Sequence, residues 1–221
     1  MTGVIEDLNL NFYPKDNIKF FHNTIIFWNN FIGPLDDKTL EFIRIKQIEI
    51  IDFGKNFNSS IDGLENCESI LSIRLHYNFQ QQINKWPPQL IRLYLGMDYS
   101  LRLNIWPNSL RFLDLANNLH MLPSLPACIE FLKIHNDSLN PYSSLIDLSY
   151  MPFNLLSLEI DCIGIEKLWD ILTPNLKHIH IIKLFVNYKD EKLEKELLPN
   201  TLIDIEILRK IVKDPKNFKY Q

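Results

Sequence analysis

The chain has 221 residues, of which 46% are hydrophobic, and its formal net charge at neutral pH is −4. This composition allows a substantial buried core and excludes a natively disordered chain. The slightly acidic balance gives no electrostatic reason to expect DNA or RNA as a partner.

Targeting signals and disulfides are not expected either. No apolar stretch approaches the ~18 residues of a membrane span, and the acidic start MTGVIEDLNL lacks the basic end of a secretion signal. The three cysteines, Cys67, Cys128 and Cys162, are too few and too scattered for a disulfide framework. We therefore expect a cytoplasmic protein in a reducing compartment, without a membrane partner.

Residues 1–44 carry only a loose version of the pattern that follows. Two apolar sets fit it, Ile5/Leu8/Leu10 and Ile25/Phe27/Phe31, and the stretch 12–31 is rich in aromatic residues. These residues predict either degenerate repeats or a cap that covers the end of the core. The sequence leaves both alternatives open.

From residue 45 onward, an apolar frame L-x-x-L-x-L recurs about every twenty residues, with Ile or Phe allowed at each apolar position. It occurs eight times, at Ile48/Ile51/Phe53, Ile70/Ile73/Leu75, Leu90/Leu93/Leu95, Leu110/Leu113/Leu115, Ile129/Leu132/Ile134, Leu155/Leu158/Ile160, Leu176/Ile179/Ile181 and Leu202/Ile205/Ile207. In each copy the last two apolar residues point to one side of a short strand. Because one strand cannot bury its face alone, the copies are expected to stack into a parallel sheet with a continuous core.

Turn residues follow the same period. Each of the first five strands is followed by a residue that favours a bend, namely Asn56, Asn78, Asp98, Asn118 and Asp137. The next residue is an apolar plug in four repeats, Phe57, Phe79, Tyr99 and Leu119. A proline precedes each later strand, at Pro87, Pro107, Pro126, Pro152, Pro174 and Pro199, and sets the angle at which the chain enters it.

The residue before each of these prolines forms a column that is mostly large and apolar, and it includes Trp86 and Trp106. We interpret both tryptophans as stacked structural residues, because a ligand cage needs aromatic rings that converge on a cavity. The longer later repeats leave room for helices at 142–151, 164–172 and 189–198, whereas the early repeats return through extended or short 3₁₀ segments. The polar stretch 211–221 is a C-terminal tail.

Several of these segments resemble the FNIP repeat, a subtype of the leucine-rich repeat superfamily found in amoebae and their giant viruses. The segments are FGKNFNSSI (53–61), LHYNFQQQI (75–83) and WPNSLRFLDL (106–115). The resemblance covers residues 45–210 and implies an α/β leucine-rich-repeat solenoid. Its parallel sheet would form the concave face, with extended or 3₁₀ segments and a few helices on the convex face. The resemblance also implies a role in protein–protein contact. We expect a cytoplasmic adaptor that presents or sequesters a host or cellular protein.

Aligned strands would place three columns of side chains on the face opposite the core. The first is Ile50, Ser72, Arg92, Phe112, Phe131, Ser157, His178 and Asp204; the central one is Asp52, Arg74, Tyr94, Asp114, Lys133, Glu159, His180 and Glu206; the third is Gly54, His76, Gly96, Ala116, His135, Asp161, Ile182 and Leu208. Charges of opposite sign alternate along the central column, apart from the uncharged Tyr94. With Phe112 and Phe131 of the first column, Tyr94 forms a group of three adjacent aromatic residues. Aromatic residues flanked by arginine are typical of binding hot spots. The predicted partner-binding residues are Arg74, Arg92, Tyr94, Phe112, Asp114, Phe131 and Lys133.

No catalytic motif is recognisable, and no cofactor is expected. His178 and His180 lie on one side of a predicted strand, but two ligands do not make a metal site. The preferred function is a non-catalytic module that binds a partner protein. The alternative is a self-associating structural protein, a homodimer formed through the aromatic residues or through an edge of the solenoid.

Overall fold

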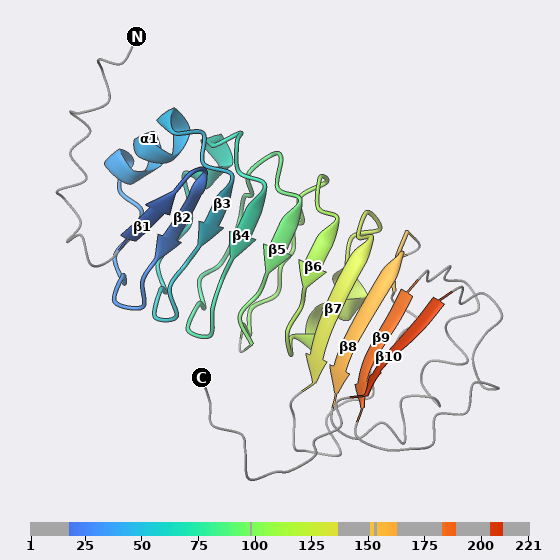
Figure 1. Ribbon diagram of the computed structural model, residues 1–221. Coiled ribbons are helices and arrows are strands. Elements are labelled where there is room, and N and C mark those ends of the chain that lie inside the picture. The colour runs from blue at the N-terminus through green and yellow to red at the C-terminus, as the bar shows by residue number, and fades with distance from the viewer. Residues whose placement is uncertain are drawn as a thin grey trace.

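The computed structural model in Figure 1 describes residues 18–97, 99–136, 151–152, 154–162, 183–188 and 204–209. Within these residues, ten strands form one sheet in which their spatial order follows the sequence. The strands are β1 (Ile18–Phe21), β2 (Thr24–Phe27), β3 (Ile50–Asp52), β4 (Ser72–Arg74), β5 (Arg92–Tyr94), β6 (Phe112–Asp114), β7 (Phe131–Asn136), β8 (Ser157–Cys162), β9 (Lys183–Tyr188) and β10 (Asp204–Arg209). The pair β1–β2 is antiparallel, and every later neighbouring pair is parallel.

Helices are few in the described part of the chain. The α-helix α1 (Asp37–Ile45) lies beside the first strands, and two short 3₁₀ helices, η2 (Leu64–Asn66) and η3 (Leu119–Ser124), lie in later connections. The fold is therefore a mostly parallel α/β sheet with few helices. None of the helices described is long and apolar enough to cross a membrane.

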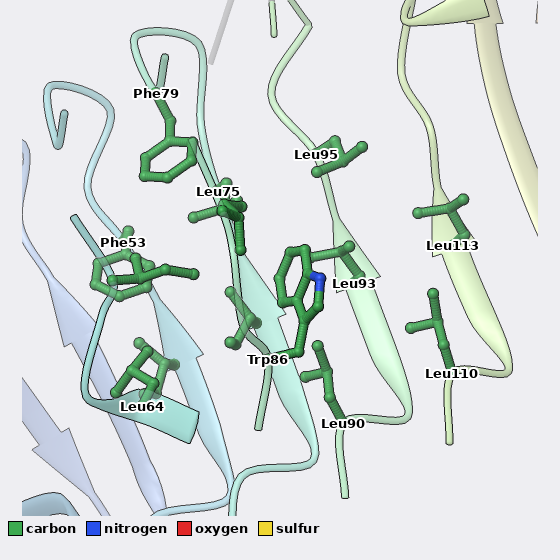
Figure 2. Close-up of a cluster of buried hydrophobic side chains, with 14 of the residues drawn as sticks. Phe53, Leu64, Leu75, Phe79, Trp86, Leu90, Leu93, Leu95, Leu110 and Leu113 are labelled. Atoms are coloured by element: carbon green, nitrogen blue, oxygen red, sulfur yellow. The ribbon is translucent and has the colours of Figure 1, made fainter. Parts of the chain in front are cut away.

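The apolar frame builds the core as the sequence predicts. Its central residues in the first five copies, Ile51, Ile73, Leu93, Leu113 and Leu132, are all buried, as are the frame residues before and after them. Figure 2 shows side chains of neighbouring repeats packed in one continuous layer, with Trp86 among the leucines. The sixth copy follows with buried Leu155 and Leu158.

Four of the six prolines that precede strands sit in a recurring tight turn, whereas Pro174 and Pro199 lie outside the described residues. The backbone N–H of the first frame residue donates to the carbonyl of the proline three residues earlier, as from Leu90 to Pro87 at 3.2 Å and from Leu110 to Pro107 at 3.1 Å. The same bond forms from Ile129 to Pro126 and from Leu155 to Pro152. A proline suits this position because its carbonyl accepts, while no N–H is required of it.

The predicted plugs form a column of stacked rings. Phe57, Phe79 and Tyr99 are each 1% exposed, and their successive ring centroids lie 6.0 and 5.9 Å apart. Phe31 extends the stack with its ring 5.8 Å from that of Phe57. The prediction is confirmed for these three plugs, whereas the side chain of Leu119 lies outside the description.

Asn118 confirms the bend role predicted for that column. It is buried and donates through Nδ2 to the carbonyls of Leu115 and of Gly96 in the previous repeat. Asn78 instead donates to the side chain of Asn56, which links two repeats on the surface. Asp98 and Asp137 lie outside the described residues.

The first 44 residues hold the hairpin β1–β2 and most of α1. β2 pairs in parallel with β3 and contributes buried Ile25 and Phe27, so the core extends to this strand. The repeating apolar frame does not predict α1. Its signal is Asp36, whose carboxylate accepts from the backbone N–H of Thr39 at 2.8 Å and so caps the helix.

The register predicted for the seventh strand is wrong. The frame places this strand around Ile179, but β9 is Lys183–Tyr188, and its Lys183 and Phe185 pair with Ser157 and Glu159. The segment LKHIHIIKLFVNY is apolar at nearly every second position, so the frame fits equally well with Leu184 and Val186. Strand pairing with β8 decides between the two registers, and the eighth strand pairs at Asp204 and Glu206 as predicted.

Several other predictions concern parts of the chain that the structure does not describe. The three predicted helices fall there, apart from Met151 at the end of the first. So do Ile5, Leu8 and Leu10, and the tail 211–221.

Candidate functional site

The face of the sheet opposite the core carries the columns that the sequence predicts, and we call it the open face. Cα pairing aligns Ile50, Ser72, Arg92, Phe112, Phe131 and Ser157, and in parallel Asp52, Arg74, Tyr94, Asp114, Lys133 and Glu159. At the seventh position, Lys183 and Phe185 replace the predicted His178 and His180, which lie outside the described residues. All seven predicted binding residues therefore stand on β4–β7 in two neighbouring columns.

Asp52 organises the charges at one end of these columns. Its carboxylate accepts from the Arg74 guanidinium at 3.3 Å and lies 2.8 Å from Nε2 of His76. Asp52 and Arg74 are neighbours in the central column, as the predicted alternation of opposite charges requires. The other neighbour of Arg74 in this column is Tyr94, and the ion pair with Asp52 holds the Arg74 guanidinium over the Tyr94 ring.

At the other end, Lys133 and His135 hold two further carboxylates. The ammonium of Lys133 lies 2.6 Å from the carboxylate of Glu159, and Nε2 of His135 lies 3.5 Å from the carboxylate of Asp114. These groups are only partly exposed, so solvent screens their attraction less than at a fully open surface.

The aromatic residues are arranged in two ways. The Tyr94 and Phe112 rings lie 5.0 Å apart at 42°, and the Arg74 guanidinium carbon lies 4.5 Å from the centroid of the Tyr94 ring. These three side chains support one another by ring contact and cation–π attraction. Phe131 is 42% exposed, which is unusual for a phenylalanine on a sheet.

A depression of about 380 Å³ lies in the open face between the two groups of charges. Five of the seven predicted residues line it, namely Arg74, Tyr94, Phe112, Asp114 and Lys133. Arg92 and Phe131 do not line it but adjoin Phe112 in the first column. The structure thus brings five predicted residues into one hollow and leaves two on the adjoining surface.

The hollow exists because two adjacent residues in the middle of the third column have small side chains. Gly96 and Ala116 stand between His76 and His135, and all four line the depression. A Cβ at Gly96 would collide with the carbonyl group of His76, so glycine is required by the close approach of the two repeats. Ala116 has a φ of 49°, and its N–H donates to the Asp114 carboxylate at 3.0 Å.

Sequence reasoning placed these four residues in one column but did not include them among the binding residues. The available signal was two small side chains between two histidines at corresponding positions of successive repeats. The depth of the hollow could not be derived from that pattern, because it depends on how closely the repeats approach.

The described residues offer no sign of metal or thiol chemistry. They contain no group of three or more His, Cys, Asp or Glu side chains that could hold a metal ion. Cys67 is 1% exposed, and burial raises the pKa of its thiol, so it is not an activated nucleophile. The chemistry that the open face provides is ring stacking, hydrogen bonding and ion pairing.

Comparison with known proteins adds no identification. No protein-family model, no curated protein and no solved structure matches the chain significantly.

Proposed function

We propose that the chain is a non-catalytic protein–protein interaction module that binds a partner protein on the open face of the sheet. We propose further that its architecture is a leucine-rich-repeat solenoid of the FNIP subtype, in which this face is the concave one. The recurring frame, the chain-order parallel register and the turn at four described prolines all support a repeat architecture.

One observation carries the functional proposal: aromatic and arginine side chains surround a hollow on a sheet face that carries no layer of helices in the described part of the chain. Phe131, Phe112 and Tyr94 offer rigid apolar area, and Arg74 and Arg92 offer planar donors. Tyrosine and arginine are enriched where binding energy concentrates in protein interfaces. The hollow gives such an interface a recess for a partner's side chain.

The resemblance to amoebal and giant-virus repeats suggests the setting. We propose a cytoplasmic adaptor that presents or sequesters a protein of the host cell. Affinity capture from amoebal lysate tests this, with the chain as bait and mass spectrometry to identify what it retains. Each retained protein is then purified, and its affinity is measured by calorimetry.

The decisive comparison is with the double variant Phe112→Ala/Phe131→Ala. The matched control is Ile105→Ala, which removes an apolar side chain that is 56% exposed outside the open face. We expect the control to keep the partner and the double variant to weaken binding by at least tenfold, which corresponds to about 1.4 kcal/mol. Unchanged affinity in a correctly folded double variant would place the interface elsewhere.

Self-association is the second candidate, because large apolar side chains are exposed at the first strands. Phe21 is 64% exposed and Trp28 is 53% exposed. Light scattering reports the mass of the wild-type chain and the same two variants. With no partner captured, a dimer that dissociates in the double variant would favour a homodimer through the aromatic residues of the open face, and a dimer that persists would favour one through the first strands.

A further inference from the structure

Arg92 is an exception among the charged side chains described on the open face of β3–β8. Asp52, Arg74, Asp114, Lys133 and Glu159 each have a partner of opposite charge or a histidine within 3.5 Å. The Arg92 side chain is exposed and forms no ion pair or hydrogen bond with any described residue, although its backbone N–H donates to the Leu71 carbonyl. Its guanidinium is the unbalanced charge of this surface.

Arg92 also stands beside the exposed aromatic residues. Its Cα partner is Phe112, whose own partner on the other side is Phe131. Neighbouring strands are about 4.8 Å apart, so the guanidinium and the Phe131 ring belong to positions about 10 Å apart along one column. Ile91, which is 38% exposed, adds apolar surface next to Arg92.

A partner that covers Phe112 and Phe131 must therefore also remove water from Arg92. Burying a guanidinium without a counter-charge is strongly unfavourable, and a second cation there would be repelled. A carboxylate meets both requirements, because it accepts two parallel N–H bonds from the planar guanidinium. The hollow beside it adds no unbalanced charge, since its two cations, Arg74 and Lys133, are matched in number by two carboxylates, those of Asp114 and Glu159.

We propose that the partner segment is an acidic peptide. It places an Asp or Glu carboxylate on Arg92 and a large apolar side chain on Phe112 and Phe131. This inference rests on the proposed function, since it specifies the chemistry of the partner at the same face. Arg92 acts as the residue that selects the partner's charge, and the two phenylalanines supply apolar contact area.

Selection from a phage-displayed library of random dodecapeptides tests the inference. The baits are the wild-type chain, Arg92→Glu, Arg92→Gln, Arg102→Glu and the double variant Phe112→Ala/Phe131→Ala. Arg102 is exposed and lies outside the strands, so Arg102→Glu makes the same charge change away from the open face. Circular dichroism confirms that each bait is folded, and Arg92→Gln serves if the charge reversal impairs folding.

We expect wild type and Arg102→Glu to enrich peptides with Asp or Glu next to a large apolar residue. Arg92→Glu is expected to enrich Lys or Arg at the acidic position, and Arg92→Gln to lose the charge preference. A synthetic peptide of the wild-type consensus should bind Arg92→Glu at least tenfold more weakly, because a close charge pair becomes a repulsive one.

The opposing results are distinct. Peptides that bind wild type, and that Phe112→Ala/Phe131→Ala loses, but that show no acidic preference overturn the role of Arg92 and leave the binding face intact. The same peptides selected by wild type and Arg92→Glu overturn it equally. A failure of every bait to enrich any peptide above an unrelated protein would count against the proposed function itself.

Discussion

The indole N–H of Trp86 donates a 2.8 Å hydrogen bond to the backbone carbonyl of Ile105, the residue that precedes Trp106 in the next repeat. Trp86 is 7% exposed and belongs to the core. Its recurrence about twenty residues later is thus a structural feature that joins successive repeats, as the sequence analysis proposed. Trp106 packs against the same core, but its own indole N–H is buried without a hydrogen-bond partner among the described residues.

The two tryptophans should respond differently to the same substitution. Trp86→Phe leaves the Ile105 carbonyl without its donor and is expected to lower the free energy of unfolding by about 1–3 kcal/mol. Trp106→Phe removes an unsatisfied donor and is expected to change it by less than about 1 kcal/mol. Urea denaturation measures both variants, and equal losses would mean that the hydrogen bond is not the reason.

The ring stack predicts a large loss at its centre. Phe79 lies between Phe57 and Tyr99 and is 1% exposed, so Phe79→Ala opens a cavity and is expected to cost about 3–5 kcal/mol. Phe131→Ala, at an exposed position, is the control and should cost less than about 1 kcal/mol. Comparable losses in thermal denaturation would contradict the assignment of these two rings to core and surface.

Substitutions at two small residues that line the depression should differ in their effect on the free energy of unfolding. Gly96→Ala forces a Cβ against the His76 carbonyl group and is expected to destabilise the fold by about 1–3 kcal/mol. Ala116→Gly relieves a left-handed backbone conformation, which offsets the loss of one methyl group, and the net change should stay below about 1 kcal/mol. Denaturant midpoints with unchanged slopes would establish that both effects are on stability. A neutral Gly96→Ala would contradict the close approach of the two repeats.

Tyr99 makes stability depend on alkaline pH. Burial raises the pKa of Tyr99 to about 12, against an ordinary value of 10. The unfolded chain therefore loses this proton first as the pH rises, so unfolding releases a proton between about pH 10 and pH 12 and stability falls through that window. The loss reaches about 3 kcal/mol at its upper end.

Tyr99→Phe isolates this contribution, because the other tyrosines titrate in both proteins. At neutral pH the variant loses the hydrogen bond from the Tyr99 hydroxyl to the Gln81 carbonyl, which costs about 1 kcal/mol. Above pH 10 the difference should shrink and then reverse. A constant difference between the two unfolding free energies across that window would show that Tyr99 ionises normally.

Much of the fold could be predicted from the sequence because each repeat contains residues that specify its own strand and turns. The frame residues around Ile73, Leu93 and Leu113 alternate with mostly polar neighbours, of which Phe112 is an exception, and this period of two places one set of side chains toward the core. The prolines recur at one offset before β5–β8 and the plug residues at one offset after β3–β6, so together with the frame they set the register of β3–β8 from local patterns alone. Where apolar residues recur at nearly every second position beyond the length of one strand, as in 176–188, the local pattern fits two registers, and only pairing with β8 decides.

The helix α1 was missing from the prediction for a different reason. Asp36 is a recognisable N-cap, and Leu40 and Ile43 share one helical face. The repeating frame begins only at Ile48, so a search for repeats does not detect a single short helix before it. Contact with the first strands, as between the rings of Phe42 and Phe20 at 5.4 Å, gives this helix its place.

The candidate site, like the fold, could be predicted only in part from the sequence. The sequence by itself determined which side chains leave the core, because strand periodicity sets the direction of Arg92, Phe112 and Phe131. Only the tertiary structure decided that Tyr94 and Phe112 lie against each other, that Phe131 stays exposed, and that a hollow opens above Gly96 and Ala116. These properties depend on distances between residues about twenty positions apart, which strand packing sets and local sequence does not encode.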